Sequence, residues 1–287
     1  MSNNSNNYDK YPKLDEREKY FIRIPRNIIF DTSLGKNRVG VFAYLSCKTS
    51  LDSKFLISMR LICNWLNRRI DTHSNNKGVK EICGLVDKYK EMGIVDIDEE
   101  VQITKMIEGC FHKDKVQEMI DNKNGFGTIY VDEIEKILNY RNKSKRKWWT
   151  TDEEDEDIKI DTSYVLLVFA YLRSMIIPRN NLAGAAHRTE TFDGYYRQIE
   201  DEIGLSERKV SQAISVLIKV GLIYERKRPP IVKYYYVDGK RIKKHVPQTS
   251  IFCNTYKRLN GHLIDYGESY YMKEADDKEK ELDENQD

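Results

Sequence analysis

The stretch "YYRQIEDEIGLSERKVSQAISVLIKVG" (195–221) carries the clearest structural pattern in the chain. Its first part places Tyr195, Ile199 and Ile203 at fourfold spacing, which predicts a helix with one apolar face. "GLS" (204–206) comes next. The glycine suits a helix C-terminus, the leucine can fill the angle between two helices, and the serine suits the N-cap of a second helix.

The second helix is predicted over 207–220, "ERKVSQAISVLIKV". Its inward face should carry the apolar residues at helical spacing: Val210, Ile214 and Leu217. The sequence over 221–246 then alternates as strands do, and Asp238-Gly239 within it is a hairpin turn signal. A helix, a glycine turn, a second helix and a basic hairpin follow one another in a winged helix-turn-helix.

A repeated pentapeptide indicates that this unit occurs twice. "VFAYL" stands at 41–45 and again at 168–172. Gly93 follows Val41 by 52 residues, and Gly221 follows Val168 by 53. Counting back from the two glycines aligns the apolar pairs Val86 with Ile214 and Tyr89 with Leu217. The fold class predicted from this repeat is α+β, with two tandem winged helix-turn-helix domains.

The first copy is less regular than the second. Its turn, 68–76, is longer, and its wing is predicted to be split between "IVDID" (94–98) and "FGTIYV" (126–131). The insert between these two strands, 99–125, contains a predicted helix at 114–122, and a further helix is predicted over 132–140.

Charge is strongly segregated along the chain. "DEEDED" (152–157) carries six negative charges, and the segment 274–287 has a net charge of −6, so the overall +2 leaves +14 on the rest. This pattern predicts a basic body with acidic, disordered appendages. The predicted divisions are a disordered N-terminus (1–20), a first winged-helix domain with insert (21–140), a charged linker (141–160), a second winged-helix domain (161–258) and an acidic tail (259–287).

The composition predicts a soluble, cytoplasmic protein. Charged residues make up 33% of the chain, and no apolar run approaches the ~20 residues of a membrane span. The first 18 residues lack the apolar core of a signal peptide. Five cysteines without a CxxC pair indicate free thiols in a reducing compartment.

The second copy carries the stronger signal for DNA. From Arg208 to Lys244 the chain has eleven Lys or Arg against two acids, a net charge of +9. Clustered cations supply affinity for phosphate, while arginine and glutamine can read base edges in the major groove. Polar residues on any exposed helix and protein-binding winged helices are the competing explanation. The residues predicted to bind DNA are Arg208, Lys209, Ser211, Gln212, Ser215 and Lys219 on the helix, with Arg226, Lys227, Arg228, Lys240, Arg241, Lys243 and Lys244 on the wing.

The first copy offers a thinner set of cations. Arg68, Arg69, Lys77 and Lys80 surround its turn and second helix, but acids share that helix. The alternative is a dimerisation or scaffold domain with the same fold. The run "KSKRKWW" (143–149) could clamp phosphates and stack on a base, although a solvated linker is the favoured interpretation.

No motif for catalysis is present in the sequence. There is no G-x-x-x-x-G-K-[ST] loop for a nucleotide and no HExxH or similar spacing for a metal. The sequence therefore predicts a protein that is not an enzyme and needs no cofactor.

The segment "YFIRIPRNIIFD" (20–31), followed by the VFAYL helix and the helix-turn-helix, resembles the amino-terminal domain of replication initiators from plasmids, phages and integrated elements of AT-rich bacteria. In those proteins an Ile-Pro motif precedes a winged-helix domain. The tandem arrangement is similar to initiators whose two winged helices contact successive grooves of repeated sites. The resemblance covers most of 20–258 and departs from that family in the unequal turns and the insert. It implies binding of double-stranded DNA, opening of AT-rich DNA and recruitment of the host helicase machinery.

Two other functions compete with this interpretation. A transcriptional regulator of a mobile element would use the same surface, whereas a helicase-loading or other adaptor would bind protein through its winged helices. A homodimer is a partner arrangement that the sequence leaves open.

Overall fold

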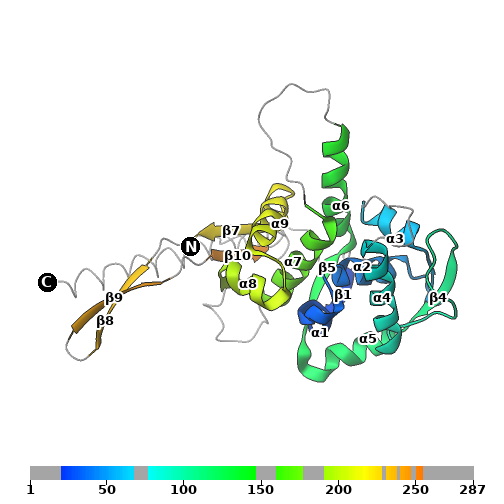
Figure 1. Ribbon diagram of the computed structural model, residues 1–287, viewed down its shortest axis with the longest axis horizontal. Helices are drawn as coiled ribbons and strands as arrows, with labels where there is room; N and C mark the ends of the chain where they lie inside the picture. The colour runs from blue at the N-terminus through cyan, green and yellow to red at the C-terminus, as the bar shows by residue number, and fades with distance from the viewer. Residues whose placement is uncertain are drawn as a thin grey trace, which may run out of the picture. The chain divides into compact units, whose positions relative to one another are not determined.

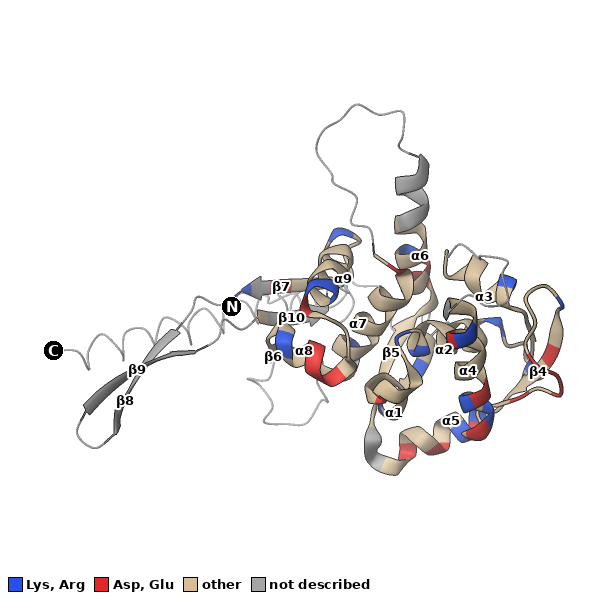
Figure 2. Ribbon diagram, in the orientation of Figure 1, with Lys and Arg blue, Asp and Glu red and all other residues tan. Residues whose placement is uncertain are grey.

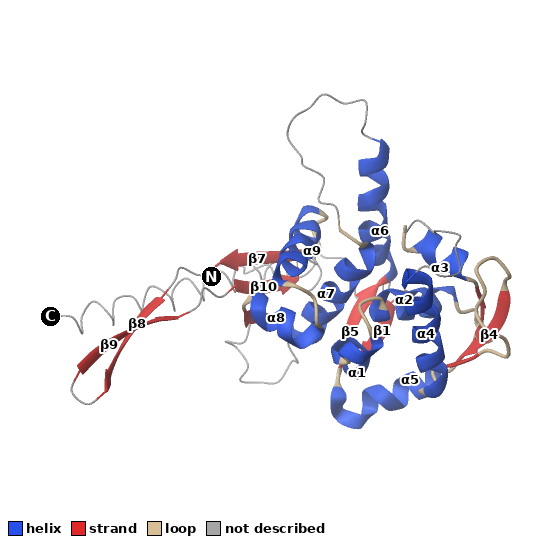
Figure 3. Ribbon diagram, viewed as in Figure 1, coloured by secondary structure: helices blue, strands red, loops and turns tan. Residues whose placement is uncertain are grey.

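The computed structural model has a mixed α+β fold (Figures 1 and 3). It describes residues 21–67, 77–146, 160–176, 191–227, 231–237, 240–246 and 250–254. The chain separates into two compact units, the larger made of Tyr20–Met175 and Gly194–Val220, the smaller of Met1–Lys19, Ile176–Asp193 and Gly221–Asp287. The predicted disordered N-terminus (1–20) and acidic tail (259–287) lie outside the described residues, as does 147–159 of the predicted linker.

Two apolar helices form the centre of the larger unit and pack against each other (Figure 1). They are α2 (Arg38–Lys48) and α7 (Thr162–Met175), the two helices that contain VFAYL. Both copies of the pentapeptide are buried, as expected of helices that are apolar all round. The two backbones approach closely at Gly40, where a Cβ atom would lie 3.0 Å from the Ser163 Oγ atom.

A two-stranded antiparallel ribbon covers α7. Strand β1 (Phe21–Pro25) pairs with β5 (Phe126–Tyr130) in a register that places Ile24 opposite Gly127. The prediction that "FGTIYV" forms part of a wing is therefore wrong. Gly127 explains the difference, because its lack of a side chain lets β5 lie directly against the α7 backbone, where a Cβ atom would be 2.6 Å from the Ala170 carbonyl oxygen.

The remaining elements of the first half surround α2. A short helix α1 (Arg26–Phe30) and the 3-10 helix η4 (Thr32–Leu34) lead into it. The chain then forms β2 (Lys54–Ile57), α3 (Met59–Trp65), α4 (Lys77–Glu91), β3 (Val95–Asp96) and β4 (Ile107–Phe111). The three strands form an antiparallel sheet in the order β2-β4-β3. The strand that pairs with "IVD" thus lies inside the segment 99–125 that was predicted as an insert.

Three helical segments follow the first sheet. The predicted helix at 114–122 corresponds to α5 (Lys113–Met119) and a π-helical segment η5 (Ile120–Asn124). The predicted helix at 132–140 is α6 (Val131–Arg146), which continues beyond its expected end. The first six residues of the predicted linker are therefore helical.

The predicted helix pair of the second half is confirmed. Helices α8 (Tyr196–Ile203) and α9 (Glu207–Lys219) pack against each other and against α7. Five of the six apolar residues assigned to these faces are buried: Ile199, Ile203, Val210, Ile214 and Leu217. Their burial follows from the helical spacing seen in the sequence. The sixth, Tyr195, occupies the N-cap position before α8 and is 40% exposed, so its assignment to the buried face is wrong.

The elements described in the smaller unit are strands. β6 (Thr191–Gly194), β7 (Ile223–Lys227) and β10 (Ser250–Asn254) form a sheet in the order β6-β10-β7, in which Phe192 stacks on Phe252 with ring centroids 6.1 Å apart. β8 (Ile231–Val237) and β9 (Lys240–Val246) pair antiparallel with Val237 opposite Lys240, which confirms the predicted hairpin. Its turn residues, Asp238 and Gly239, lie outside the described residues.

The same order of elements follows both VFAYL helices. Each is succeeded by a strand, two helices and two further strands that form a sheet, and in each sheet the last strand lies between the first two. In the second copy, the β8–β9 ribbon is inserted before that last strand. Gly93 and Gly221, which end the second helices, have φ values of +69° and +68°. Such left-handed conformations favour glycine, which explains the matching positions of these residues in the sequence.

Candidate nucleic-acid interface

The turn between α8 and α9 has the geometry that its sequence predicts, with one exception. Gly204 has a left-handed conformation with φ of +71°, and its N–H donates to the Glu200 carbonyl at 2.8 Å. Leu205 is fully buried. Ser206 occupies the N-cap position with an extended backbone, but its side chain makes no capping hydrogen bond. Ser206 therefore stands at the predicted N-cap position without the predicted side-chain hydrogen bond.

The outward face of α9 carries five of the six residues predicted from this helix. Arg208 and Lys219 are exposed, while Ser211, Gln212 and Ser215 between them are half-buried. The hydroxyl of Ser215 donates to the Ser211 carbonyl at 2.9 Å within the helix. Arg208, Gln212 and Lys219 therefore supply the long donors of this face. The Lys and Arg positions of α9 are blue in the ribbon of Figure 2.

Lys209 lies apart from that face. Its ammonium group is 4.5 Å from the centre of the Tyr164 ring on α7, and the residue is half-buried. A cation above an aromatic ring is attracted to it electrostatically. The structure thus separates Lys209 from Arg208, although the two are neighbours in the sequence.

The cations that were predicted for a wing lie on strands of the smaller unit, apart from one outside the described residues. Lys227 is exposed at the end of β7, and Arg226 is opposite Ile251 in the β7–β10 pair. On β9 the register sets the predicted cations against residues of β8: Lys240 opposite Val237, Arg241 opposite Tyr236, Lys243 opposite Tyr234 and Lys244 opposite Lys233. Arg228 lies outside the described residues.

In the first half, the cations and the acids are mixed. Lys77 begins α4, and Lys80 is exposed beside the exposed Glu81, whereas Arg68 and Arg69 lie outside the described residues. Two other lysines of α4 contact carbonyl groups: Lys88 that of Ser33, and Lys90 that of Ile97 at 2.6 Å.

The loop between β3 and β4 in the first half is acidic. Between Asp96 and Glu108 the chain carries five acids and a single lysine, Lys105, which pairs with Glu99. Acidic residues are visible around β4 in Figure 2. This loop packs back on α3, since the N–H groups of Met59 and Arg60 donate to the carbonyls of Gln102 and Ile103, each at 3.0 Å.

A groove of about 760 Å³ lies beside this loop. Its apolar lining comes from α2, α3, β2 and the residue that precedes β4: Tyr44, Phe55, Leu56, Leu61, Trp65 and Met106. Leu56 and Met106 are 50% and 61% exposed, whereas most large apolar side chains of the described residues are buried. An exposed apolar groove of this kind is typical of protein or ligand contacts.

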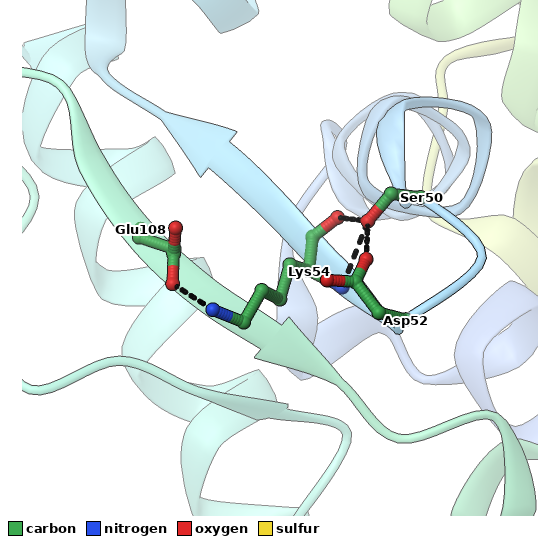
Figure 4. Close-up of polar contacts among 4 residues, drawn as sticks. All are labelled: Ser50, Asp52, Lys54 and Glu108. Carbon is green, nitrogen blue, oxygen red and sulfur yellow. Dashed lines mark hydrogen bonds and ion pairs between the residues drawn. The ribbon is translucent and has the colours of Figure 1, made fainter.

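Polar contacts at the rim of the groove close the free edge of β2 (Figure 4). The Lys54 carbonyl accepts from the Ser50 N–H and hydroxyl at 2.8 and 2.7 Å, and the hydroxyl also contacts Asp52. Lys54 forms an ion pair with Glu108 at 2.7 Å. Further along, the Tyr44 hydroxyl donates to the Leu56 carbonyl at 2.7 Å. A partner in this groove would therefore contact side chains and not extend the sheet.

Comparisons of the chain with protein-family models, with curated proteins and with solved structures find no match. Within the described residues, no helix is long and apolar enough to cross a membrane. Nor do three or more His, Cys, Asp or Glu side chains gather there as a metal-binding group.

Two structural features escaped the sequence analysis. The groove could have been suspected from Leu56, because in "KFLI" it occupies an outward position of an alternating strand. Arg38 had no such signal. It stands just before VFAYL as an ordinary charged residue, yet it is almost fully buried.

Proposed function

We propose that the protein binds double-stranded DNA sequence-specifically and acts as a replication initiator of the type found in plasmids and phages. The observation that carries the DNA proposal is the outward face of α9, which follows a tight glycine turn and presents Arg208, Gln212 and Lys219. The basic strands β7 and β9 come next in the chain, and 208–244 has a net charge of +9. The initiator role rests further on the resemblance of most of residues 20–258 to such proteins.

In the proposed mechanism, both halves are winged helix-turn-helix domains. The repeated element order and the repeated sheet order support this assignment. Helix α9 would lie in the major groove, where Arg208 can contact guanine and Gln212 can contact adenine. The cations of β7 and β9 would contact phosphates, which increases affinity without selecting a sequence. Bound copies would then open nearby AT-rich DNA and recruit the helicase machinery of the host.

For the first half, a protein-binding role is better supported than DNA contact. An acidic loop repels phosphates, and the lysines Lys88 and Lys90 are engaged with carbonyl groups. The apolar groove with the exposed Leu56 and Met106 suits a protein partner. In this arrangement the second half selects the DNA site and the first half contacts another protein or a second copy of the chain.

A footprint combined with a salt titration tests the proposal. The purified protein is incubated with DNA that contains and flanks its own gene, and protection from nuclease is mapped. Several protected repeats spaced by whole turns of about 10.5 bp indicate an initiator, and one site over a promoter indicates a regulator. Phosphate contacts predict that log K falls by roughly 0.9 per neutralised phosphate for each log unit of salt. Absence of protection, or an affinity that does not respond to salt, would reject DNA binding and favour an adaptor.

A further inference from the structure

Arg38 is a buried guanidinium that joins three separate segments of the larger unit. It is 1% exposed. Its Nε and Nη2 atoms donate to the Ile29 carbonyl at 3.0 and 2.6 Å, and its Nη1 atom donates to the Gly35 carbonyl at 2.7 Å. The Nη2 atom also donates to the Ile203 carbonyl at 2.9 Å, across 165 residues of sequence. All of these acceptors are backbone groups, so the contacts depend on the main-chain fold.

The Ile203 carbonyl is the last of α8 and directly precedes the turn into α9. The final carbonyls of a helix lack partners within the helix and carry its negative dipole end, and a cation there is favourable. A second contact holds the same turn: a Cβ atom at Gly204 would lie 3.1 Å from the Thr32 Cγ2 atom of η4. The segment 29–38 therefore packs directly against the turn of the helix pair.

The same segment is held from its other side by α4. The Tyr89 hydroxyl donates to the Arg38 carbonyl at 2.5 Å, and Lys88 contacts the Ser33 carbonyl. Tyr89 is fully buried, with its ring against Phe42 of the first VFAYL helix. Arg38 thus belongs to one packed layer that connects α4 of the first half with the α8–α9 turn.

Burial lowers the pKa of Arg38 to about 10, because desolvation disfavours the charged form. The side chain nevertheless remains protonated at neutral pH and keeps all of its donors. A buried cation is costly unless its hydrogen bonds are satisfied, so the four bonds have to be kept together.

We propose that Arg38 is the residue that positions the DNA-reading helix α9, by holding the C-terminal carbonyl of α8 against the segment 29–38. The proposal rests on the proposed DNA-binding function of α9. Arg38 itself is buried and would not touch DNA. Loss of its contact with Ile203 would let the α8–α9 turn move, so the base-reading face would lose its fixed orientation while the phosphate-binding strands stayed intact.

The test compares Arg38→Met and Arg38→Lys with Ile57→Ala, a core change in β2 that lowers stability outside the α8–α9 turn. Hydrogen exchange is measured on peptides covering 196–210 and 131–140, and affinity is measured on a footprinted site and on random DNA, well below the melting temperature of each variant. For Arg38→Met we expect faster exchange in the 196–210 peptide and unchanged exchange in the 131–140 peptide, at least a tenfold loss on the specific site, and unchanged affinity for random DNA. Arg38→Lys keeps the positive charge and an ammonium donor, and it should retain part of the specificity.

Three results would overturn the inference. The first is an Arg38→Met variant that keeps the wild-type exchange pattern and specificity. The second is an Ile57→Ala variant that loses specificity to the same degree, which would indicate general destabilisation. The third applies if Arg38→Met does not fold, and it is wild-type specificity in Arg38→Lys. If the wild-type protein binds no DNA, the proposed function is rejected. The difference in hydrogen exchange at 196–210 between wild type and Arg38→Met still reports whether Arg38 holds the turn.

Discussion

Arg173 on α7 and Glu133 on α6 form a buried ion pair, with the Nη2 atom of Arg173 2.6 Å from a Glu133 oxygen. Their side chains are 5% and 1% exposed, and the second Glu133 oxygen accepts from the Tyr130 N–H at 3.0 Å. The pair joins α6 to α7 at the end of the β5 strand. A buried charge without its partner is unfavourable, so the two residues depend on each other.

We expect Glu133→Gln to lower the free energy of unfolding by about 3 kcal/mol, because Arg173 would remain buried and unpaired. The double variant Glu133→Leu/Arg173→Met should cost less than Glu133→Leu or Arg173→Met alone, since no unpaired charge remains. Urea unfolding of these four variants measures both quantities. Equal losses for Glu133→Gln and for the exposed substitution Glu108→Gln would show that the buried pair contributes little.

Gly127→Ala should disrupt the packing of β5 on α7. The added Cβ atom would meet the Ala170 carbonyl oxygen at 2.6 Å, which backbone atoms cannot avoid without a shift. Overpacking of this kind costs about 1–3 kcal/mol. The control is Gly84→Ala on α4, where the added atom meets nothing within 4 Å and the helix should gain about 0.5–1 kcal/mol. Thermal or urea unfolding should therefore shift in opposite directions for the two variants.

Arg208→Ala should reduce affinity for the specific DNA site by about 1–3 kcal/mol and relax the preference at one base pair. Lys243→Ala should instead weaken binding to all sequences about equally and reduce the salt dependence, as expected for a phosphate contact. Arg197→Ala, an exposed residue on α8, serves as the control of equal charge. Fluorescence anisotropy on specific and random duplexes separates these effects. If Arg208→Ala and Lys243→Ala affect both duplexes alike, α9 is not the base-reading helix.

Met106→Asp should abolish binding of a protein partner to the groove without affecting DNA binding. The residue is 61% exposed, so the folded state should tolerate the change. A charge placed in the apolar lining would have to be desolvated on docking. Light scattering of wild-type and variant protein over a concentration range detects a partner that is a second copy. Leu51→Asp, a change at an exposed turn residue outside the groove lining, is the control and should leave association unchanged.

Stability should decrease in alkaline solution. Burial raises the pKa of Tyr44 from 10.0 to about 12 and that of Cys47 from 9.0 to about 11. Burial also raises the pKa of Tyr89. The folded state then holds these protons after the unfolded state has released them, so the stabilisation is complete below pH 9 and is lost as the pH rises toward 11–12. Urea midpoints at pH 8, 9, 10 and 10.5 measure this, and Tyr44→Phe should flatten the upper part of the curve. A midpoint that does not change with pH would contradict the expectation.

Part of the candidate site could be predicted because its pattern is local. The spacing of Val210, Ile214 and Leu217 specifies which side of α9 is buried, and the opposite side then carries Arg208 and Lys219. The separation of Lys209 could not be predicted in this way, because its neighbour Tyr164 belongs to α7, 45 residues earlier in the sequence.

The strand assignment of the first half failed for a related reason. The composition of "FGTIYV" predicts a strand, but it does not specify the strand with which that segment pairs. The alternative partner, Phe21–Pro25, is more than 100 residues away. Gly127 allows the resulting ribbon to contact α7, and that contact favours this pairing over an extended wing.

Local sequence was sufficient for the α8–α9 pair, for the helices near 114–122 and 132–140 and for the glycine turns, since each depends on the spacing of apolar residues or on the backbone freedom of glycine at a single position. Tertiary structure alone brought the two VFAYL helices together, paired β1 with β5, and placed Arg38 against the carbonyl of Ile203. These contacts join residues far apart in the sequence. They depend on how the shapes and charges of several segments fit at once, and no single segment contains that information.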